Sequence, residues 1–176
     1  MNNFPQINRT SLIIGLVLAA ALIRLLPHPP NFAPIAAMAL FSGAYMTDRR
    51  LAFLVPLAAL FLTDLILGFH STLAFVYVAF AVTVVLGFLL RRNRGTYRLL
   101  GVALSSSTLF FIITNFGTWL VQDLYPKDGA GLAACFTAAI PFFQHTVAGD
   151  LFFVLLLFGG MRLLERQENV AATAFD

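Results

Sequence analysis

The sequence predicts an all-α protein, a polytopic membrane protein whose single transmembrane domain, residues 1–176, is a six-helix bundle. Its composition and its length lead to this fold class. Of the 176 residues, 60% are hydrophobic and 11% are charged, whereas a soluble domain carries about 25% charged residues. The mean hydropathy of +0.87 points the same way. A chain of this length has room for about six spans of roughly 20 residues, and none for a second folded domain.

Six apolar runs with breaks between them predict the helices. The first run continues past its alanines to Arg24 and further spans follow, so we expect a retained helix and not a signal peptide. The second is short and follows the rigid turn Pro27–Pro30. The third begins after Arg49 and Arg50, and the fourth ends before Arg91. The predicted ranges are Ser11–Leu26, Pro34–Met46, Leu51–Gly68, Leu73–Leu90, Leu99–Val121 and Thr146–Leu164.

A further apolar segment, Leu132–Phe143, lies between the fifth and sixth runs and contains Pro141. At this length it predicts a re-entrant or interfacial piece before the last helix. Irregular backbone at membrane depth is tolerated only where protein or a water-filled cavity covers it. Gly129 and Gly131 would provide hinges, so we expect this segment to act as a lid.

The arginines of the chain predict its orientation, because cytoplasmic loops are rich in Lys and Arg. With six spans, the N-terminus, the second and fourth loops and the C-terminal tail share one face, whereas the opposite loops carry Lys127 and have Arg24 at the tip of the first helix. We therefore expect a multi-pass protein with both termini in the cytoplasm. The arginines on the predicted cytoplasmic face are Arg9, Arg49, Arg50, Arg91, Arg92, Arg94, Arg98, Arg162 and Arg166.

Four polar residues in different predicted helices fall at a similar depth, near the outer face. They are Arg24, Asp64, Asn115 and Asp150. Ionisable groups inside spans are costly, and they usually face a partner or a wet cavity. A cation between two carboxylates would relieve the desolvation of all three groups. The four residues therefore predict either a shared polar site that opens outward or an Arg24–Asp pair that fixes helix packing.

Histidines and aromatic residues gather on the same predicted side. His28, His70 and His145 could bind a transition metal together with Cys135, but they lack HxH or HxxxH spacing, which favours hydrogen bonding to a ligand. Phenylalanines and Trp119 form either an interfacial belt or the wall of a pocket for a flat ligand. The candidate ligand-binding residues are Arg24, His28, Asn31, Asp64, His70, Asn115, Trp119, His145 and Asp150.

Some classes of function are excluded or disfavoured. The sequence has no GxSxG, no HExxH and no phosphate-binding glycine loop, which are motifs of hydrolytic and nucleotide-binding enzymes. A single cysteine, Cys135, excludes an internal disulfide and a Cys-based zinc site, and is most simply a small buried apolar residue. No basic face of the size that nucleic acid requires is present. The residues themselves predict no bound cofactor.

The chain resembles the substrate-binding S components of energy-coupling-factor vitamin transporters, six-helix proteins of this length with an outward-facing pocket roofed by loops. The local likeness lies in Asn31–Tyr45, which the Arg49-Arg50 turn and Asp64 follow. The strings Leu26–Phe32, Ile113–Gly117 and Ala139–Phe143 are also similar to a family of small, uncharacterised bacterial inner-membrane proteins. The resemblance implies the bacterial cytoplasmic membrane as the location.

The resemblance also implies partners and ligands. S components often dock onto a transmembrane coupling subunit through a small-residue motif on the first helix, where this chain has Gly15 and Ala19. Such a pair also allows close helix approach within one chain. Some cobalamin-binding members ligate cobalt with a cysteine, which makes a cobalt-containing corrinoid a possible ligand of Cys135. The metal-binding N-terminal histidine of the nickel and cobalt members has no counterpart in Met1–Phe4.

The leading prediction is a membrane protein that binds or transports a small, vitamin-like nutrient. Arg24 would hold a carboxylate or phosphate of the ligand, Asn115 and the acids would contact its polar edges, and Trp119 would stack on it. A second hypothesis is a membrane enzyme that modifies a cofactor or lipid through Cys135 or a histidine-bound metal. A third is a structural or assembly subunit in which the polar residues only join helices.

Overall fold

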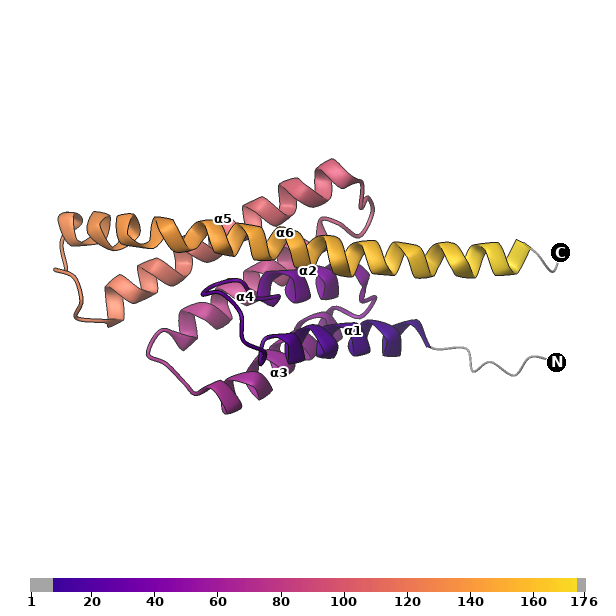
Figure 1. Ribbon diagram of the computed structural model, residues 1–176, viewed down its shortest axis with the longest axis horizontal. Coiled ribbons are helices and arrows are strands. Elements are labelled where there is room, and N and C mark those ends of the chain that lie inside the picture. Colours follow the sequence, from indigo (N-terminus) through magenta and orange to yellow (C-terminus); the bar gives the residue numbers. More distant parts are fainter. Residues whose placement is uncertain (1–7, 174–176) are drawn as a thin grey trace.

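The computed structural model describes residues 8–173, which form six helices and, within that range, no strand. The all-α fold class is thereby confirmed. Consecutive helices run back and forth along the long axis of the molecule, and the start of α1 and the end of α6 lie at the same end (Figure 1). The helices are α1 (Arg9–Ile23), α2 (Ile35–Tyr45), α3 (Arg49–Leu67), α4 (Leu73–Phe88), α5 (Thr96–Val121) and α6 (Gly129–Thr173).

Three of the six helices are long and apolar enough to cross a membrane, namely α3, α5 and α6. By length and composition they indicate a membrane protein. The other three, α1, α2 and α4, are apolar but have 15, 11 and 16 residues. At 1.5 Å per residue these reach about 22, 17 and 24 Å, less than the roughly 30 Å of a hydrocarbon core. The expected number of helices is confirmed, whereas six helices of full spanning length are not found.

The short helices end early for local reasons. After α1, the N–H groups of Arg24, Leu25 and Leu26 bond to carbonyls three residues back, a tight turn that leads into Pro27. The helix α2 starts after Pro34 and stops at Met46, whose ψ of 126° is extended. The C-terminal ends of α1, α2 and α4 therefore come one to three residues before the predicted ends.

The last helix corrects the sequence analysis. Leu132–Phe143 was expected to be a separate re-entrant or interfacial lid and Thr146–Leu164 a separate helix, but both belong to one helix of 45 residues with Pro141 inside it. A proline removes one backbone hydrogen bond, and membrane helices tolerate this where neighbouring groups satisfy the backbone. Continuing the helix satisfies the backbone groups on either side of the proline, which a re-entrant loop would leave to other partners.

The length of α6 takes it beyond the rest of the bundle. Forty-five residues reach about 67 Å, more than the 40–45 Å or so of a whole bilayer with its headgroups. In Figure 1 the yellow end of α6 projects past the other helices. Arg162, which donates to the carbonyl of Arg94, marks the level at which α6 leaves the bundle, and Arg166 follows one turn later; both fit a segment that is leaving the apolar layer.

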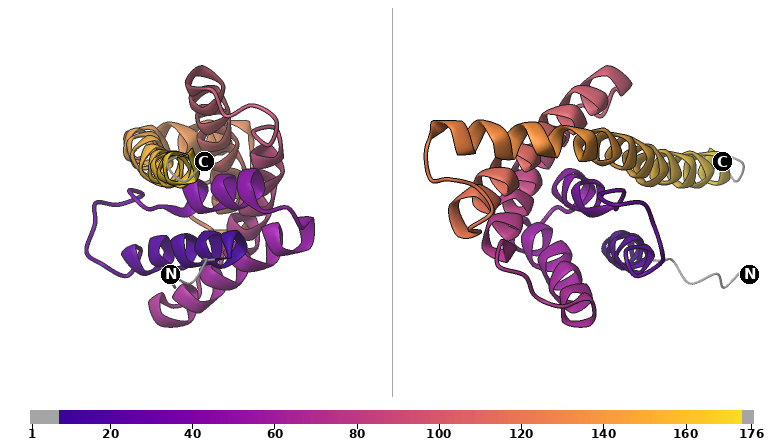
Figure 2. Two further views of the ribbon diagram at one scale, coloured as in Figure 1. Left: turned by 90° about the vertical axis from the view of Figure 1, so that its right-hand side faces the viewer. Right: turned by 60° about the vertical axis from the view of Figure 1, so that its left-hand side comes forward.

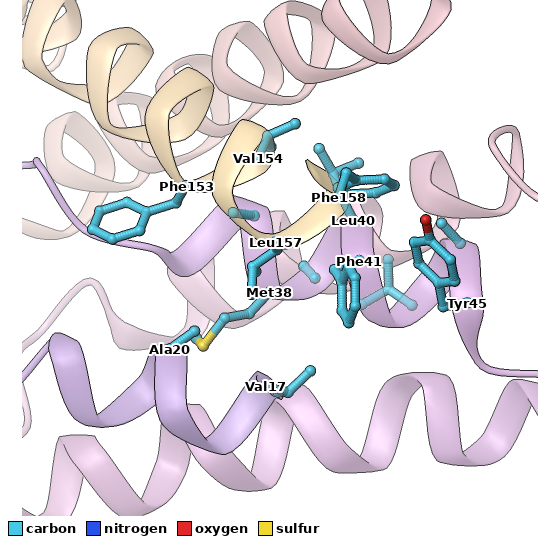
Figure 3. Packing of buried hydrophobic residues seen from close by; sticks show 14 of the residues in the cluster. Val17, Ala20, Met38, Leu40, Phe41, Tyr45, Phe153, Val154, Leu157 and Phe158 are labelled. Carbon is cyan, nitrogen blue, oxygen red and sulfur yellow. The ribbon is translucent and has the colours of Figure 1, made fainter. Parts of the chain in front are cut away.

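The helix α2 forms the centre of the bundle. Ten of its eleven residues are buried, and it contacts each of the other five helices. Two views in Figure 2 show it between α1 and α6. Figure 3 shows the packing, in which Met38 and Phe41 of α2 meet Val17 of α1 and Phe158 of α6. Because it is shielded from lipid by protein, α2 has no need of full spanning length.

Arginines at one end of the bundle complete the C-terminal turn of α2. The last carbonyls of a helix lack partners within the helix itself. Here Arg91 donates to the carbonyls of Gly43 and Met46 at 2.9 and 2.7 Å, and Arg94 donates to that of Ala44 at 2.9 Å. Burial, and next the charge of Arg49, lower the pKa of the Arg91 guanidinium.

The outer surface of the bundle is largely apolar. Leu62, Leu65 and Ile66 on the outer face of α3 are 55%, 53% and 70% exposed, and many large apolar side chains elsewhere are similarly exposed. A water-soluble monomer rarely exposes contiguous apolar patches of this kind, which mark contact with membranes or partners. This surface and the three long apolar helices together support a lipid environment.

Candidate functional site

A cavity of about 340 Å³ lies at the end of the bundle opposite to the arginines that close α2. Its wall combines the turn after α1, the loop before α2, the loop before α4, and one face each of α5 and α6. The lining residues are Arg24, Asn31, Ala33, Ile35, Ala36, His70, Val76, Phe110, Phe111, Thr114, Asn115, Thr118, Ala139, Phe142, Thr146 and Asp150. The size falls within the range of small-molecule sites.

Arg24 lies on the cavity wall and is also paired with an acid. Its Nη1 is 2.6 Å from Oδ1 of Asp64 and donates to the Thr63 hydroxyl at 2.6 Å. The other oxygen of Asp64 accepts a hydrogen bond from the Tyr77 hydroxyl at 2.9 Å. The side chains of Arg24 and Asp64 are 12% and 2% exposed. The structural pair expected from the sequence is therefore present, and it forms part of the cavity wall.

Asp150 is the second buried acid, and its environment differs. It is 4% exposed and lies on the cavity wall. Its Oδ2 accepts a hydrogen bond from the hydroxyl of Ser107 on α5 at 2.6 Å. Neither of the two ion pairs found in the described part of the chain includes Asp150. A buried carboxylate with one hydroxyl donor and no cation is incompletely compensated.

A stripe of α5 supplies the aromatic and neutral polar part of the wall. Phe110, Phe111, Thr114, Asn115 and Thr118 follow the spacing of one helix face. The two threonine hydroxyls and the Asn115 amide donate to carbonyls four residues back, at 2.8–3.1 Å. These bonds use the hydroxyl hydrogens and one amide hydrogen, so the threonine oxygens and Oδ1 of Asn115 are left chiefly as hydrogen-bond acceptors.

Aromatic rings back this stripe. The centroid of Phe111 is 4.7 Å from that of Phe143 and 5.6 Å from that of Phe136, both on α6. Phe142 itself lines the cavity. Three of the phenylalanines expected on this side therefore lie in or directly behind the wall, whereas Phe69 is exposed and is not among the lining residues.

The nine candidate residues are distributed unevenly. Arg24, Asn31, His70, Asn115 and Asp150 line the cavity. His28 is exposed and lies in an adjoining recess that shares Arg24 and Asn31 with it. Asp64 is held behind Arg24 by the ion pair.

The remaining two candidates, Trp119 and His145, line neither the cavity nor the adjoining recess. The indole N–H of Trp119 donates to the carbonyl of Pro126 at 2.9 Å, which ties the end of α5 to the following loop. His145 is exposed on the surface of α6. Both share a depth with the cavity residues, but their helix positions direct them elsewhere.

The candidate metal ligands are spread apart. Among the residues that the structure describes, no group of three His, Cys, Asp or Glu side chains is placed to hold a metal ion. Cys135 is 2% exposed, and its thiol donates to the carbonyl of Asn115 with a sulfur–oxygen distance of 3.5 Å. It is not among the cavity-lining residues.

Sequence reasoning did not single out the hydroxyl groups of the site. Thr114, Thr118 and Thr146 line the cavity, and Ser107 and Tyr77 bond to the two buried acids. Hydroxyls in apolar helices commonly bond their own backbone and therefore give little signal. The one available indication of a polar wall was that Thr114 and Thr118 lie one helix turn apart, on the same helix face as Asn115.

The chain belongs to the family of unknown function DUF6580, whose pattern matches residues 5–172. The match covers nearly the whole chain, so the cavity and all its lining residues fall inside the family region. No curated protein and no solved structure matches the chain. The likeness to S components therefore stays a prediction.

Proposed function

We propose that this protein binds a small, vitamin-like nutrient in the cavity between α1, α5 and α6 and takes part in its transport across the membrane. The observation that carries the proposal is the cavity itself. It is about 340 Å³ in volume, and a buried acid, an ion-paired arginine and two asparagines share its wall with three phenylalanines. Polar groups that converge on one cavity together with aromatic side chains are typical of a small-molecule site.

The proposed topology has six crossings in the bacterial cytoplasmic membrane. The short helix α2 is enclosed by protein, and the turns after α1 and α4 lengthen the crossings of those helices. The arginines that close α2, and those on α6, lie at the end where α1 starts. By the positive-inside rule this end and both termini are in the cytoplasm. The cavity, at the opposite end, then faces outward.

A coupling subunit is the proposed partner. Gly15 and Ala19 both lie on the exposed face of α1, one helix turn apart. A Cβ added to Gly15 would meet nothing within 4 Å, so these small residues do not serve packing inside the chain. Small residues on a free helix face allow another helix to approach closely. We expect the wild-type protein to co-purify with an ATPase-containing complex, and the Gly15→Leu variant to do so poorly.

The test is native mass spectrometry of gently purified protein, followed by small-molecule analysis after denaturation. We expect a stoichiometric metabolite in the wild type and its loss in Asp150→Asn. The matched control is Asp123→Asn, because Asp123 is exposed and lies outside the cavity. A protein that stays empty, even after incubation with pooled vitamins, would contradict the proposal and favour the enzyme or assembly hypotheses. Equal occupancy in wild type and Asp150→Asn would contradict the assignment of the site.

A further inference from the structure

The charges around the cavity do not cancel. Arg24 contributes a positive charge, and Asp64 neutralises it at 2.6 Å. Asp150 adds a second carboxylate, which receives a hydrogen bond from Ser107 and, among the residues that the structure describes, forms no ion pair. His70, the other titratable group on the wall, is exposed, where water screens its effect. When Asp150 is ionised, the buried groups thus leave one negative charge in excess.

The N-terminus of α2 acts in the opposite direction but is weaker. Ile35 and Ala36, its first residues, lie on the cavity wall. A helix N-terminus carries the equivalent of about half a positive charge, less than the full charge of a carboxylate. The negative excess of Asp150 therefore persists after this contribution is counted.

The neutral polar groups on the α5 wall of the cavity add to this bias. Thr114 and Thr118 give their hydroxyl hydrogens, and Asn115 one of its two amide hydrogens, to backbone carbonyls, so these wall residues are left chiefly with oxygen acceptors. Phe111 and Phe142 complete this wall, and aromatic faces attract cations. A carboxylate, acceptor oxygens and aromatic faces all suit a ligand that carries hydrogen-bond donors and positive charge.

We propose that the ligand of this cavity is an organic cation, a small aromatic or heteroaromatic compound whose ammonium or amidinium group pairs with Asp150. This inference rests on the proposed binding function and narrows its substrate class. It replaces the expectation that Arg24 holds an acidic group of the ligand, because Asp64 already neutralises the charge of that guanidinium. A carboxylate or phosphate ligand would instead place another negative charge in a site that already has an excess.

The experiment uses three indole probes of similar size that differ in charge: tryptamine as the cation, tryptophol as the neutral compound and indole-3-acetate as the anion. The full-length protein in lipid nanodiscs is dialysed against an equimolar mixture of the three. Retained probes are measured by mass spectrometry and corrected with empty nanodiscs. Asp150→Asn is the test variant and Asp123→Asn the control, and thermal unfolding establishes that each is folded.

We expect tryptamine to be retained at least about ten-fold over the other two probes, equivalent to about 1.4 kcal/mol, by wild type and Asp123→Asn. Asp150→Asn should lose this preference. Preferential retention of the anion, equal retention of all three, or a preference that survives in folded Asp150→Asn would overturn the inference while leaving a binding function intact. Retention of none of the probes would also overturn it. The metabolite analysis above decides the proposed function separately, because it requires no assumption about ligand charge.

Discussion

Removing both partners of the Arg24–Asp64 pair is expected to cost less than the sum of removing each partner alone. Arg24→Met leaves a carboxylate that is 2% exposed with the Tyr77 hydroxyl as its remaining donor. Breaking a buried ion pair in this way costs about 3–5 kcal/mol. Asp64→Asn should cost less, because the Arg24 side chain is 12% exposed and borders the cavity, which gives the freed guanidinium access to water. The amide in Asp64→Asn also retains an oxygen that can accept the hydrogen bond of the Tyr77 hydroxyl.

The double variant removes both charges and should be less destabilised than the sum of the two single variants. We expect a coupling free energy of about 1–3 kcal/mol, the range found for residues in direct contact. Thermal unfolding of ligand-free protein in detergent, followed through Trp119 fluorescence, gives the four stabilities of the cycle. Unfolding rates at a fixed temperature replace equilibrium values if unfolding is irreversible.

The chain provides its own control in the Arg9–Glu165 pair, whose side chains are 59% and 30% exposed. An exposed ion pair contributes about 0–1 kcal/mol, so Arg9→Met should change stability little. If the Arg24 and Asp64 effects were additive, or if Arg9→Met cost as much as Arg24→Met, the assignment of Arg24–Asp64 as a coupled buried pair would be refuted.

Two further predictions concern helix packing and topology. Gly43→Ala should destabilise the protein by about 1–3 kcal/mol, because the added Cβ would press on the α4 backbone. Gly101→Ala is the control and should not destabilise it, because a Cβ at Gly101 would meet nothing within 4 Å. Equal unfolding temperatures for the two variants would contradict the close α2–α4 crossing. In a cysteine-free background, a cysteine at Ser71 should react with an impermeant maleimide from outside whole cells and one at Asn93 should not; the reverse pattern would invert the proposed orientation.

How far the sequence predicts the fold depends on the kind of signal. Apolar runs between charged loops located all six helices, because burying a polar or charged group in lipid is costly. The error fell at Pro141, where proline usually marks a helix end. Inside a bundle, packing against α5 and continuity of the backbone hydrogen bonds outweigh one lost bond, and the helix runs on. Because this balance depends on contacts with a neighbouring helix, the local sequence around Pro141 does not reveal it.

The site was predicted in part for a similar reason. Arg24, Asn115 and Asp150 stand out because polar groups in apolar runs must face one another or a cavity. Depth along the bundle follows from the sequence, but the direction in which a side chain faces follows from helix packing. Trp119 and His145 have a suitable depth but are not among the residues that line the cavity. Depth alone therefore predicted more site residues than the cavity contains.

The shortness of α2 connects the fold to the cavity. A helix of full length in the centre of the bundle would fill the space between α5 and α6 from one end to the other. Here α2 starts only at Ile35, and Ala33, Ile35 and Ala36 form part of the cavity wall. Pro34 precedes the helix, and a residue before proline disfavours helical backbone, so Ala33 cannot readily extend α2 backwards. The same proline that shortens the central helix therefore keeps the cavity open above it.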